Sequence, residues 1–394
     1  HALRDAARPL QKGINMKKIK WIPLLLTALC SASAVSCGKN DASGSMRDIS
    51  TAQVVKEMGV GWNLGNTLEA CGSWITGSSV ENYETAWGNP VTTKEMIDGI
   101  AGAGFKSVRI PVAWSNMMAE DYTIDASLVS RVKEVTGYVL DNDMYAIINI
   151  HWDGGWISKA DEDHDGTLEK YKAVWKQVTA EFSDYSDKLI FESLNEEGVY
   201  ENTWNRYSNA GDKEKAFGLL NELNQTFVDL VRESGGNNAK RHLLIAGYAT
   251  DVDLTCDPAF KMPVDSQNRC AVSVHYYTPS TFAILTEDAD WGKARSTWGS
   301  TKEINELNGY MDKLKTTFVD KGVPVIIGEF GTTTTNKEPE SVRLYLRSVA
   351  QAAWDRGMCP MLWDNGEHYD RSTCKFRDEE LLQGLQTVMQ SQRD

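Results

Sequence analysis

Side chains that build metal centres are few in this sequence and poorly spaced. It has six His in 394 residues, and no two of its seven Cys stand at the Cys-x-x-Cys spacing of a zinc site. Among the His residues, only His151 and His275 stand at the ends of short apolar runs, so only these two could come together at one site. A metal-dependent hydrolase is therefore disfavoured, and we expect neither a metal ion nor another cofactor.

Cysteine also provides no complete disulfide framework. Seven Cys minus Cys30 and Cys37, which lie in an N-terminal targeting segment, leaves five, an odd number. Cys256 and Cys270 flank one predicted loop and are the best candidates for a bridge. Buried free thiols are the equally weighted alternative.

Basic residues are fewer than acidic ones. The 41 Lys and Arg against 55 Asp and Glu give a formal net charge of -14, which repels polyanions, so nucleic acid is not an expected partner. The composition, 41% hydrophobic and 24% charged, excludes a disordered or collagen-like chain.

The apolar stretch 21–30 is too short to span a bilayer. It follows the basic segment Met16–Lys20 and precedes small residues, which is the pattern of a secretory signal. The signal offers an ordinary cleavage site at Ala32–Ala34 and a lipobox-like ending at Cys37. We therefore expect a location outside the cytoplasm, either secreted or as a bacterial surface lipoprotein attached to the membrane by its lipid alone.

Four segments follow from this pattern. Residues 1–15 are interpreted as an upstream extension, 16–37 as the signal peptide, 38–45 as a polar tether and 46–394 as one folded domain. No low-complexity linker or second module follows residue 46.

Eight short apolar runs alternate with segments of helical periodicity in this domain. The runs are 60–64, 107–110, 145–150, 189–194, 242–246, 271–275, 324–328 and 360–363. Between them, apolar residues recur every three or four positions, except in the stretch 248–269. Buried strands that alternate with helices are typical of parallel α/β folds, and eight repeats predict a single (β/α)8 TIM barrel.

Residues able to bind a ligand stand where these runs end. They are Asn63, Arg109, His151, Asn195, Glu196, His275, Tyr277, Glu329, Trp363 and Asp364. The carboxyl ends of all barrel strands meet at one face, where active sites form. One such residue would be explained by packing, but many converging polar groups are costly to desolvate without a ligand.

Glu196 and Glu329 end the fourth and seventh predicted strands. A pair of carboxyl groups suits the cleavage of glycosidic bonds, in which one protonates the leaving oxygen and the other attacks or stabilises the anomeric carbon. The two need different pKa values, and Arg109 and Tyr277 are available as donors that keep one of them ionised.

Six motifs, in this order, resemble glycoside hydrolase family 5. They are GWNLGNT at 61–67, VRIP at 108–111, SLNE at 193–196, VHYY at 274–277, IGEFG at 327–331 and LW at 362–363. The resemblance is strongest to subfamily 4, bacterial endo-β-1,4-glucanases that include many xyloglucanases. It covers the chain from about Met46 to the C-terminus. The six motifs together are specific to the family, whereas Asn-Glu alone would be weak evidence for it.

The resemblance implies roles for the site residues. Glu196 would be the general acid/base and Glu329 the nucleophile of a retaining reaction. Asn195 would bind the 2-hydroxyl of the sugar at the cleavage point, and Trp363 would form the floor beneath that sugar.

Further residues would support the carboxylates or the substrate. The resemblance implies that Arg109, His151, His275 and Tyr277 orient and polarise the carboxylates, and Asn63 and Trp152 are further candidates for substrate binding or support. Trp152 departs from the family pattern, because many relatives carry a second His after the one that matches His151. The sugar contact at this position is therefore expected to differ.

Other Trp residues lie in or beside predicted loops, where an indole face can stack on a pyranose ring. Sugar contact and core packing are equally weighted for Trp152, Trp156, Trp204 and Trp298. Core packing is favoured for Trp62, Trp74, Trp87 and Trp291.

Asp161–Gly166 follows the first half of a calcium loop, D-x-D-x-D-G. Lys172 stands where the bidentate Glu that completes such a site belongs. This favours a solvated acidic loop with an exposed His164.

These observations predict a monomeric endo-β-1,4-glucanase (cellulase) whose partner is a neutral plant glucan: xyloglucan, mixed-linkage β-glucan or soluble cellulose. A family 5 β-mannanase is one alternative. A surface glycan-binding protein without catalysis is another, and the presence of both Glu196 and Glu329 argues against it.

Overall fold

The computed structural model describes residues 44–198 and 200–393. The predicted extension, the signal peptide with Cys37, and all but the last two residues of the tether lie outside these ranges. Within them, no helix combines the length and the hydrophobicity that crossing a membrane requires.

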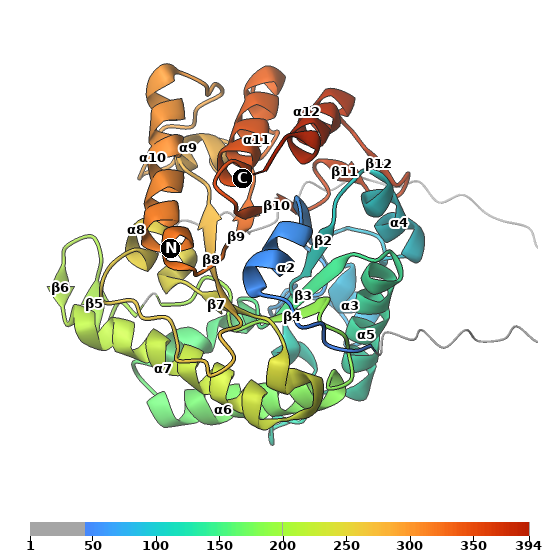
Figure 1. The fold of residues 1–394 in the computed structure, drawn as a ribbon, viewed down its shortest axis with the longest axis vertical. Helices are drawn as coiled ribbons and strands as arrows, with labels where there is room; N and C mark the ends of the chain where they lie inside the picture. Colours follow the sequence, from blue (N-terminus) through green and yellow to red (C-terminus); the bar gives the residue numbers. More distant parts are fainter. Residues whose placement is uncertain (1–43, 199, 394) are drawn as a thin grey trace, which may run out of the picture.

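A closed barrel of eight parallel strands forms the centre of the domain (Figure 1). The strands are β1 (Gly61–Leu64), β2 (Ser107–Ile110), β3 (Tyr145–Asn149), β4 (Leu189–Glu192), β7 (Leu243–Ala246), β8 (Cys270–Tyr276), β9 (Val325–Phe330) and β10 (Cys359–Asp364). They pair around the ring in the order β1-β10-β9-β8-β7-β4-β3-β2. The predicted (β/α)8 barrel is confirmed.

A helix follows each barrel strand. These helices are α4 (Lys94–Gly102), α5 (Ala126–Asp141), α6 (His164–Glu181), α7 (Lys213–Glu233), α8 (Val252–Thr255), α10 (Thr301–Thr317), α11 (Pro339–Trp354) and α12 (Glu379–Gln390). The stretch without helical periodicity contains only the four-residue α8. Asp or Ser side chains cap several helix N-termini, such as Asp125 on α5, Asp212 on α7 and Ser300 on α10.

The inward face of the strands is apolar at one end of the barrel and polar at the other. Along β3, Tyr145 and Ile147 belong to an inner apolar cluster, whereas Ile148 belongs to the outer cluster that packs against the helices. Two residues after Ile147, the inward position is the amide of Asn149, buried toward the carboxyl end. The side-chain alternation of the strands therefore separates a hydrophobic base from a polar layer above it.

The short helix α2 (Thr51–Glu57) packs on the apolar base. Val54, Val55 and Met58 join the inner cluster, and Figure 1 shows α2 near the centre of the ring of elements. Nearby, Thr51 Oγ1 lies 2.9 Å from Nδ1 of the buried His242. The amino end of the barrel is thus closed, and only the carboxyl end remains for a site.

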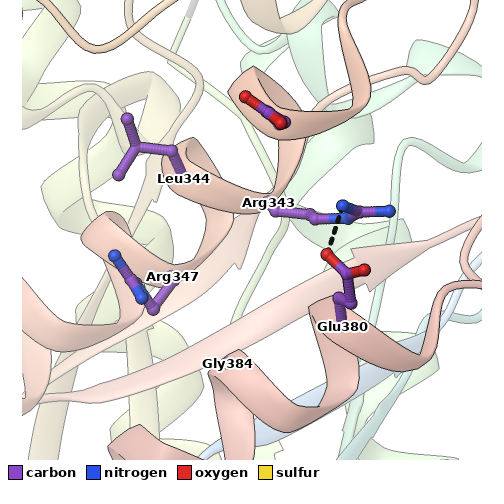
Figure 2. Close-up of a pocket in the computed structure, with 6 residues that line it drawn as sticks. Arg343, Leu344, Arg347, Glu380 and Gly384 are labelled. Carbon is purple, nitrogen blue, oxygen red and sulfur yellow. Dashed lines mark hydrogen bonds and ion pairs between the residues drawn. The ribbon is translucent and has the colours of Figure 1, made fainter.

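Smaller elements lie in the loops. They are α3 (Val80–Glu84), α9 (Ser280–Ala283), the hairpin of β5 (Trp204–Asn205) and β6 (Ala210–Gly211), and the hairpin of β11 (Tyr369–Asp370) and β12 (Lys375–Phe376). A hollow of about 300 Å³ lies between α11 and α12. Figure 2 shows the charged side chains that line it, such as Arg343 and Glu380. None of the predicted site residues lines it.

The suggested bridge between Cys256 and Cys270 is not formed. Both are free thiols, as are Cys71, Cys359 and Cys374. Cys256 follows α8 and Cys270 begins β8, so the two flank one loop as predicted, but they are not bonded to each other. The alternative of free, partly buried thiols is the one that the structure bears out.

Candidate active site

Arg109 is the centre of a hydrogen-bonded cluster at the carboxyl end of the barrel. Its guanidinium donates to Asn63 Oδ1 at 3.1 Å, to Asn195 Oδ1 at 2.8 Å and to Glu329 Oε1 at 2.7 Å. Its Nε donates to Glu192 Oε2 at 2.6 Å. The side chain is fully buried, so these contacts replace the hydration of the cation.

Glu192 forms a second polar layer beneath Arg109. Its Oε2 also accepts from Asn149 Nδ2 at 3.0 Å, and its Oε1 accepts from Ser273 Oγ at 3.0 Å. β3 and β4 pair Asn149 with Glu192 directly, which brings these two side chains together. Three strands therefore fix a buried carboxylate that has no access to solvent.

Glu329 lies on β9 and is held from two sides. Arg109 binds its Oε1, and the hydroxyl of Tyr277 donates to its Oε2 at 2.8 Å. A register shift between β8 and β9 places His275 beside Glu329 as its pairing partner. The carboxylate is 5% exposed and therefore has a fixed orientation.

Glu196 follows β4 and meets His275. His275 Nδ1 lies 2.8 Å from Glu196 Oε1 and 3.6 Å from Glu329 Oε2. Oxygen atoms of the two carboxylates and a ring nitrogen of His275 all lie within 4.8 Å of one another. The two acidic side chains thus share one small space instead of lying in separate environments.

His151 and Trp363 lie beside this cluster. Their rings are stacked, with centroids 5.9 Å apart and planes inclined by 10°. Asn149 Nδ2 lies 3.4 Å from His151 Nδ1. Trp363, on β10, is only partly buried, so an indole face remains available beside the carboxylates.

Burial and neighbouring charge set the protonation states of three site residues. Burial, assisted by the charge of Arg109, lowers the pKa of His151 to about 3, so this ring is neutral at ordinary pH. Burial and the negative charge of Glu329 raise the pKa of Tyr277 well above its usual value, which keeps its hydroxyl a donor. For Arg109, burial acts to lower the pKa, but the charges of Glu192 and Glu329 outweigh it and raise the pKa.

Glu196, His275 and Glu329 are also the group in the described part of the chain that could hold a metal ion. Their ligand atoms are engaged, because Glu196 binds His275 and Glu329 binds Arg109 and Tyr277. The positive charge of Arg109 beside Glu329 opposes a cation there. The arrangement suits proton transfer and nucleophilic attack better than metal binding.

The structure brings most of the predicted site residues into this cluster. Asn63 is fully buried and also donates to the carbonyl oxygen of Gly328, so it supports the strands and has no surface for a ligand. Asp364 organises a loop, because it accepts from Trp62 Nε1 at 3.0 Å and from the backbone of Tyr369. Trp152 lies outside the hydrogen-bonded cluster and is 38% exposed.

Glu192, Asn149 and Ser273 were not predicted. Each is a polar residue within a mostly apolar run, two to four positions before a strand-end residue. Each lies an even number of positions before a predicted site residue, Glu196, His151 or His275, and therefore points to the same side of its strand.

The tryptophans divide between core and surface. Trp204 packs against Phe217 and Tyr248, and Trp298 packs against Tyr345, so core packing, one of the two equally weighted alternatives, is the one that the structure bears out for both. Trp62 is buried as expected, whereas Trp74 and Trp291 are 41% and 47% exposed. The segments that carry Trp204 and Trp298 fold against the hydrophobic core, and the sequence pattern does not reveal this.

The loop of Trp152 and Trp156 is fixed by a buried carboxylate. Asp153 accepts from Ser115 N and Oγ and from Trp156 Nε1, all at 2.8–2.9 Å. Lys170 lies over the ring of Trp156 at 4.5 Å. Trp156 is thereby held for packing, and Trp152 is the exposed aromatic side chain of this loop.

The acidic segment is solvated, as predicted. His164, at the first turn of α6, is exposed and lies 2.9 Å from Asp165 and 2.8 Å from Glu222. Asp163 caps this helix through Gly166 N instead of facing an ion.

Residues 68–369 match the sequence profile of the cellulases, glycosyl hydrolase family 5. The chain belongs to this family. It is also similar to endoglucanase A of Paenibacillus barcinonensis, with 36% identity over 89% of this chain and 92% of the relative. A xyloglucan-specific endo-β-1,4-glucanase of Bacteroides ovatus is 35% identical over 83% of this chain and 68% of the relative.

A solved family 5 structure supports the same assignment. The subfamily 4 broad-specificity endoglucanase of Ruminococcus champanellensis, with bound cellotriose, aligns with a TM-score of 0.79 and 34% identity. The alignment covers 87% of this chain and 99% of that structure. The family 5 resemblance of the six sequence motifs is confirmed.

Proposed function

We propose that this family 5 enzyme cleaves internal β-1,4-glucosidic bonds of plant glucans by double displacement with retention of configuration. The observation that carries this proposal is the proximity of Glu196 and Glu329, whose oxygen atoms approach within 4.8 Å. Retaining glycosidases have carboxyl groups about 5–5.5 Å apart, whereas inverting enzymes need roughly 6.5–9.5 Å to seat a water molecule between them.

Glu329 is the nucleophile in this proposal. Two donors, Arg109 and Tyr277, bind one oxygen each and hold the carboxylate in a fixed orientation. The carboxylate attacks the anomeric carbon as the bond from that carbon to the leaving oxygen breaks, which yields a glycosyl ester.

Glu196 is the general acid and base. It protonates the leaving oxygen in the first step and then removes a proton from the water that hydrolyses the ester. Its side chain is 26% exposed, in contrast to the buried Glu329, and water can therefore reach it. His275, at 2.8 Å, orients this carboxylate.

Substrate contacts are assigned to four further residues. Asn195 Oδ1 accepts a hydrogen bond from Arg109, and its amide nitrogen remains as a donor for the sugar 2-hydroxyl. Trp363 stacks beneath the same sugar, and His151, which is stacked on Trp363, fixes the indole. Trp152 contacts a sugar farther from the cleavage point.

Xyloglucan, mixed-linkage β-glucan and soluble cellulose are the proposed substrates. The similarity to a xyloglucan-specific enzyme and to a broad-specificity endoglucanase supports this range. A hydrolysis screen on xyloglucan, barley β-glucan, carboxymethylcellulose and mannan tests it. Activity on mannan alone would replace the proposal by a β-mannanase.

The nucleophile assignment is tested by Glu329→Gln. This variant keeps the shape of the side chain but cannot form the ester, so turnover should be abolished while affinity for cello-oligosaccharides remains measurable by calorimetry. Unchanged turnover would overturn the assignment.

We also propose that the enzyme acts outside the cytoplasm, anchored through a lipid on Cys37. The signal-like residues 16–37 and the polar tether after them support this location. Mass spectrometry of the protein from its native membrane should find a mature N-terminus at Cys37 with added acyl mass. An unmodified terminus after Ala34 would replace the anchor with secretion.

A further inference from the structure

The charges around Arg109 are unequal in number. One guanidinium lies between two carboxylates, Glu192 at 2.6 Å and Glu329 at 2.7 Å, and Arg109 and Glu192 have no solvent-exposed surface. Among the described residues, no hydrogen bond joins Glu192 to Glu196 or His275. Glu192 is therefore separate from the reacting groups and contacts them only through Arg109.

The two carboxylates differ in what happens to their charge. In the proposed mechanism, on which this inference rests, Glu329 becomes a neutral ester when the glycosyl-enzyme forms. Arg109 then keeps its charge in a fully buried position. A buried cation without a counter-ion is strongly destabilising.

We propose that Glu192 is the permanent counter-ion of Arg109 and allows the charge of Glu329 to be lost and regained during each turnover. In the first step the Glu329 oxygen bonds to the anomeric carbon, the glycosidic bond breaks, and the leaving oxygen takes the proton of Glu196. Arg109 and Glu192 then remain as a neutral pair. In the second step water adds to the anomeric carbon, Glu196 takes its proton, and Glu329 leaves as a carboxylate that pairs with Arg109 again.

The layer beneath Arg109 holds Glu192 in place. Asn149 and Ser273 donate to its two oxygens, so three donors, including Arg109, face one carboxylate. A group that served only to fill the barrel could be apolar, like Ile147 and Ile190 in the layer below. Glu192 is thus a positioning residue that acts through Arg109.

Glu192→Gln separates the two half-reactions. Without the second negative charge, Arg109 pairs with Glu329 alone in the free enzyme, and this ion pair stabilises the free enzyme. In the glycosyl-enzyme, where Glu329 is an ester, Arg109 is left without a counter-ion. Formation of the ester should slow, and its hydrolysis, which restores the ion pair, should not. A purely structural defect would slow both steps.

The test uses 2,4-dinitrophenyl 2-deoxy-2-fluoro-β-cellobioside, which traps the glycosyl-enzyme. The rate of inactivation reports ester formation, and the rate of reactivation after removal of the reagent reports ester hydrolysis. For Glu192→Gln we expect inactivation to slow by a factor on the order of 10 to 100, with reactivation unchanged or faster. An equal decrease of both rates, or no change in either, would overturn the proposal.

Two further measurements distinguish a failure of this inference from a failure of the assignment of Glu329 as the nucleophile. Peptide mapping of the trapped wild-type enzyme should place the label on Glu329; a label elsewhere would remove the nucleophile assignment and this inference with it. If Glu192→Gln does not fold, Glu192→Asp keeps the charge at a greater distance from Arg109. It should shift the ratio of the two rates in the same direction by a smaller factor, and an unchanged ratio would contradict the proposal.

Discussion

The hydroxyl of Tyr277 donates a hydrogen bond to Glu329 Oε2 at 2.8 Å. Because burial and the charge of Glu329 keep the pKa of Tyr277 well above its usual value, this donor is present at every pH at which the enzyme can work. It contacts one oxygen of the proposed nucleophile while Arg109 contacts the other. The orientation of Glu329 therefore depends on two donors, one on β2 and one directly after β8.

Removal of the Tyr277 hydroxyl should weaken catalysis without unfolding the protein. For Tyr277→Phe we expect kcat/KM to fall by a factor on the order of 10², the usual effect of the loss of one donor aimed at a reacting oxygen. The preceding residue, Tyr276, packs in the outer core against Tyr310 and provides a matched control. Tyr276→Phe should leave kcat/KM unchanged; an equal loss in both variants would contradict the role of Tyr277.

The spacing of Glu196 and Glu329 predicts the stereochemistry of the first product. Within 4.8 Å there is no room for the water molecule of a single displacement, so the new reducing end should be the β-anomer. Proton NMR of cellopentaose hydrolysis, recorded before mutarotation, distinguishes the anomers. Initial formation of the α-anomer would exclude the proposed ester.

Trp152 should affect substrate affinity more than the chemical step. It is exposed and lies outside the hydrogen-bonded cluster, so its loss removes a stacking surface but no contact to the carboxylates. For Trp152→Ala we expect KM on xyloglucan to rise roughly threefold to tenfold, equivalent to a stacking contact of about 0.5–1.5 kcal/mol, with little change in kcat. Trp152→Phe should restore part of the affinity, and a loss confined to kcat would argue against a binding role.

The buried His242 at the amino end of the barrel should make the fold sensitive to acid. Burial, with help from the charge of Arg269, lowers its pKa from 6.5 to about 4. Between these values the unfolded chain binds a proton that the folded state does not, so the free energy of unfolding falls as the pH falls from 6.5 to 4. The effect is about 3 kcal/mol at its limit.

Urea denaturation at pH 7 and pH 4.5 measures this effect. His242→Gln should lose less stability on acidification than the wild type. His164 is the matched control, because hydrogen bonds to Glu222 and Asp165 raise its pKa, so it stabilises the folded state below its unfolded pKa and loses that effect as the pH rises. His164→Gln should therefore lose more stability at low pH than the wild type. Parallel curves for all three proteins would contradict both assignments.

The sequence by itself determined the number of strands and the residues at their carboxyl ends. Runs such as 145–150 are apolar except for one residue, and in a parallel barrel a polar residue within or at the end of such a run must lie either in the interior or at the mouth. This is why Arg109, Asn195, Glu196, His275, Tyr277 and Glu329 could be grouped before any coordinates were known.

Only the tertiary structure decided which of these groups touch. The strands are buried on both faces, so an apolar run does not reveal which alternate residues point inward, and Glu192, Asn149 and Ser273 were missed for this reason. The register shift that pairs His275 with Glu329 and the folding of Trp204 and Trp298 into the core likewise depend on contacts between distant segments. A strand pattern records burial, whereas the partners of a buried charge are set by the pairing and closure of the whole barrel.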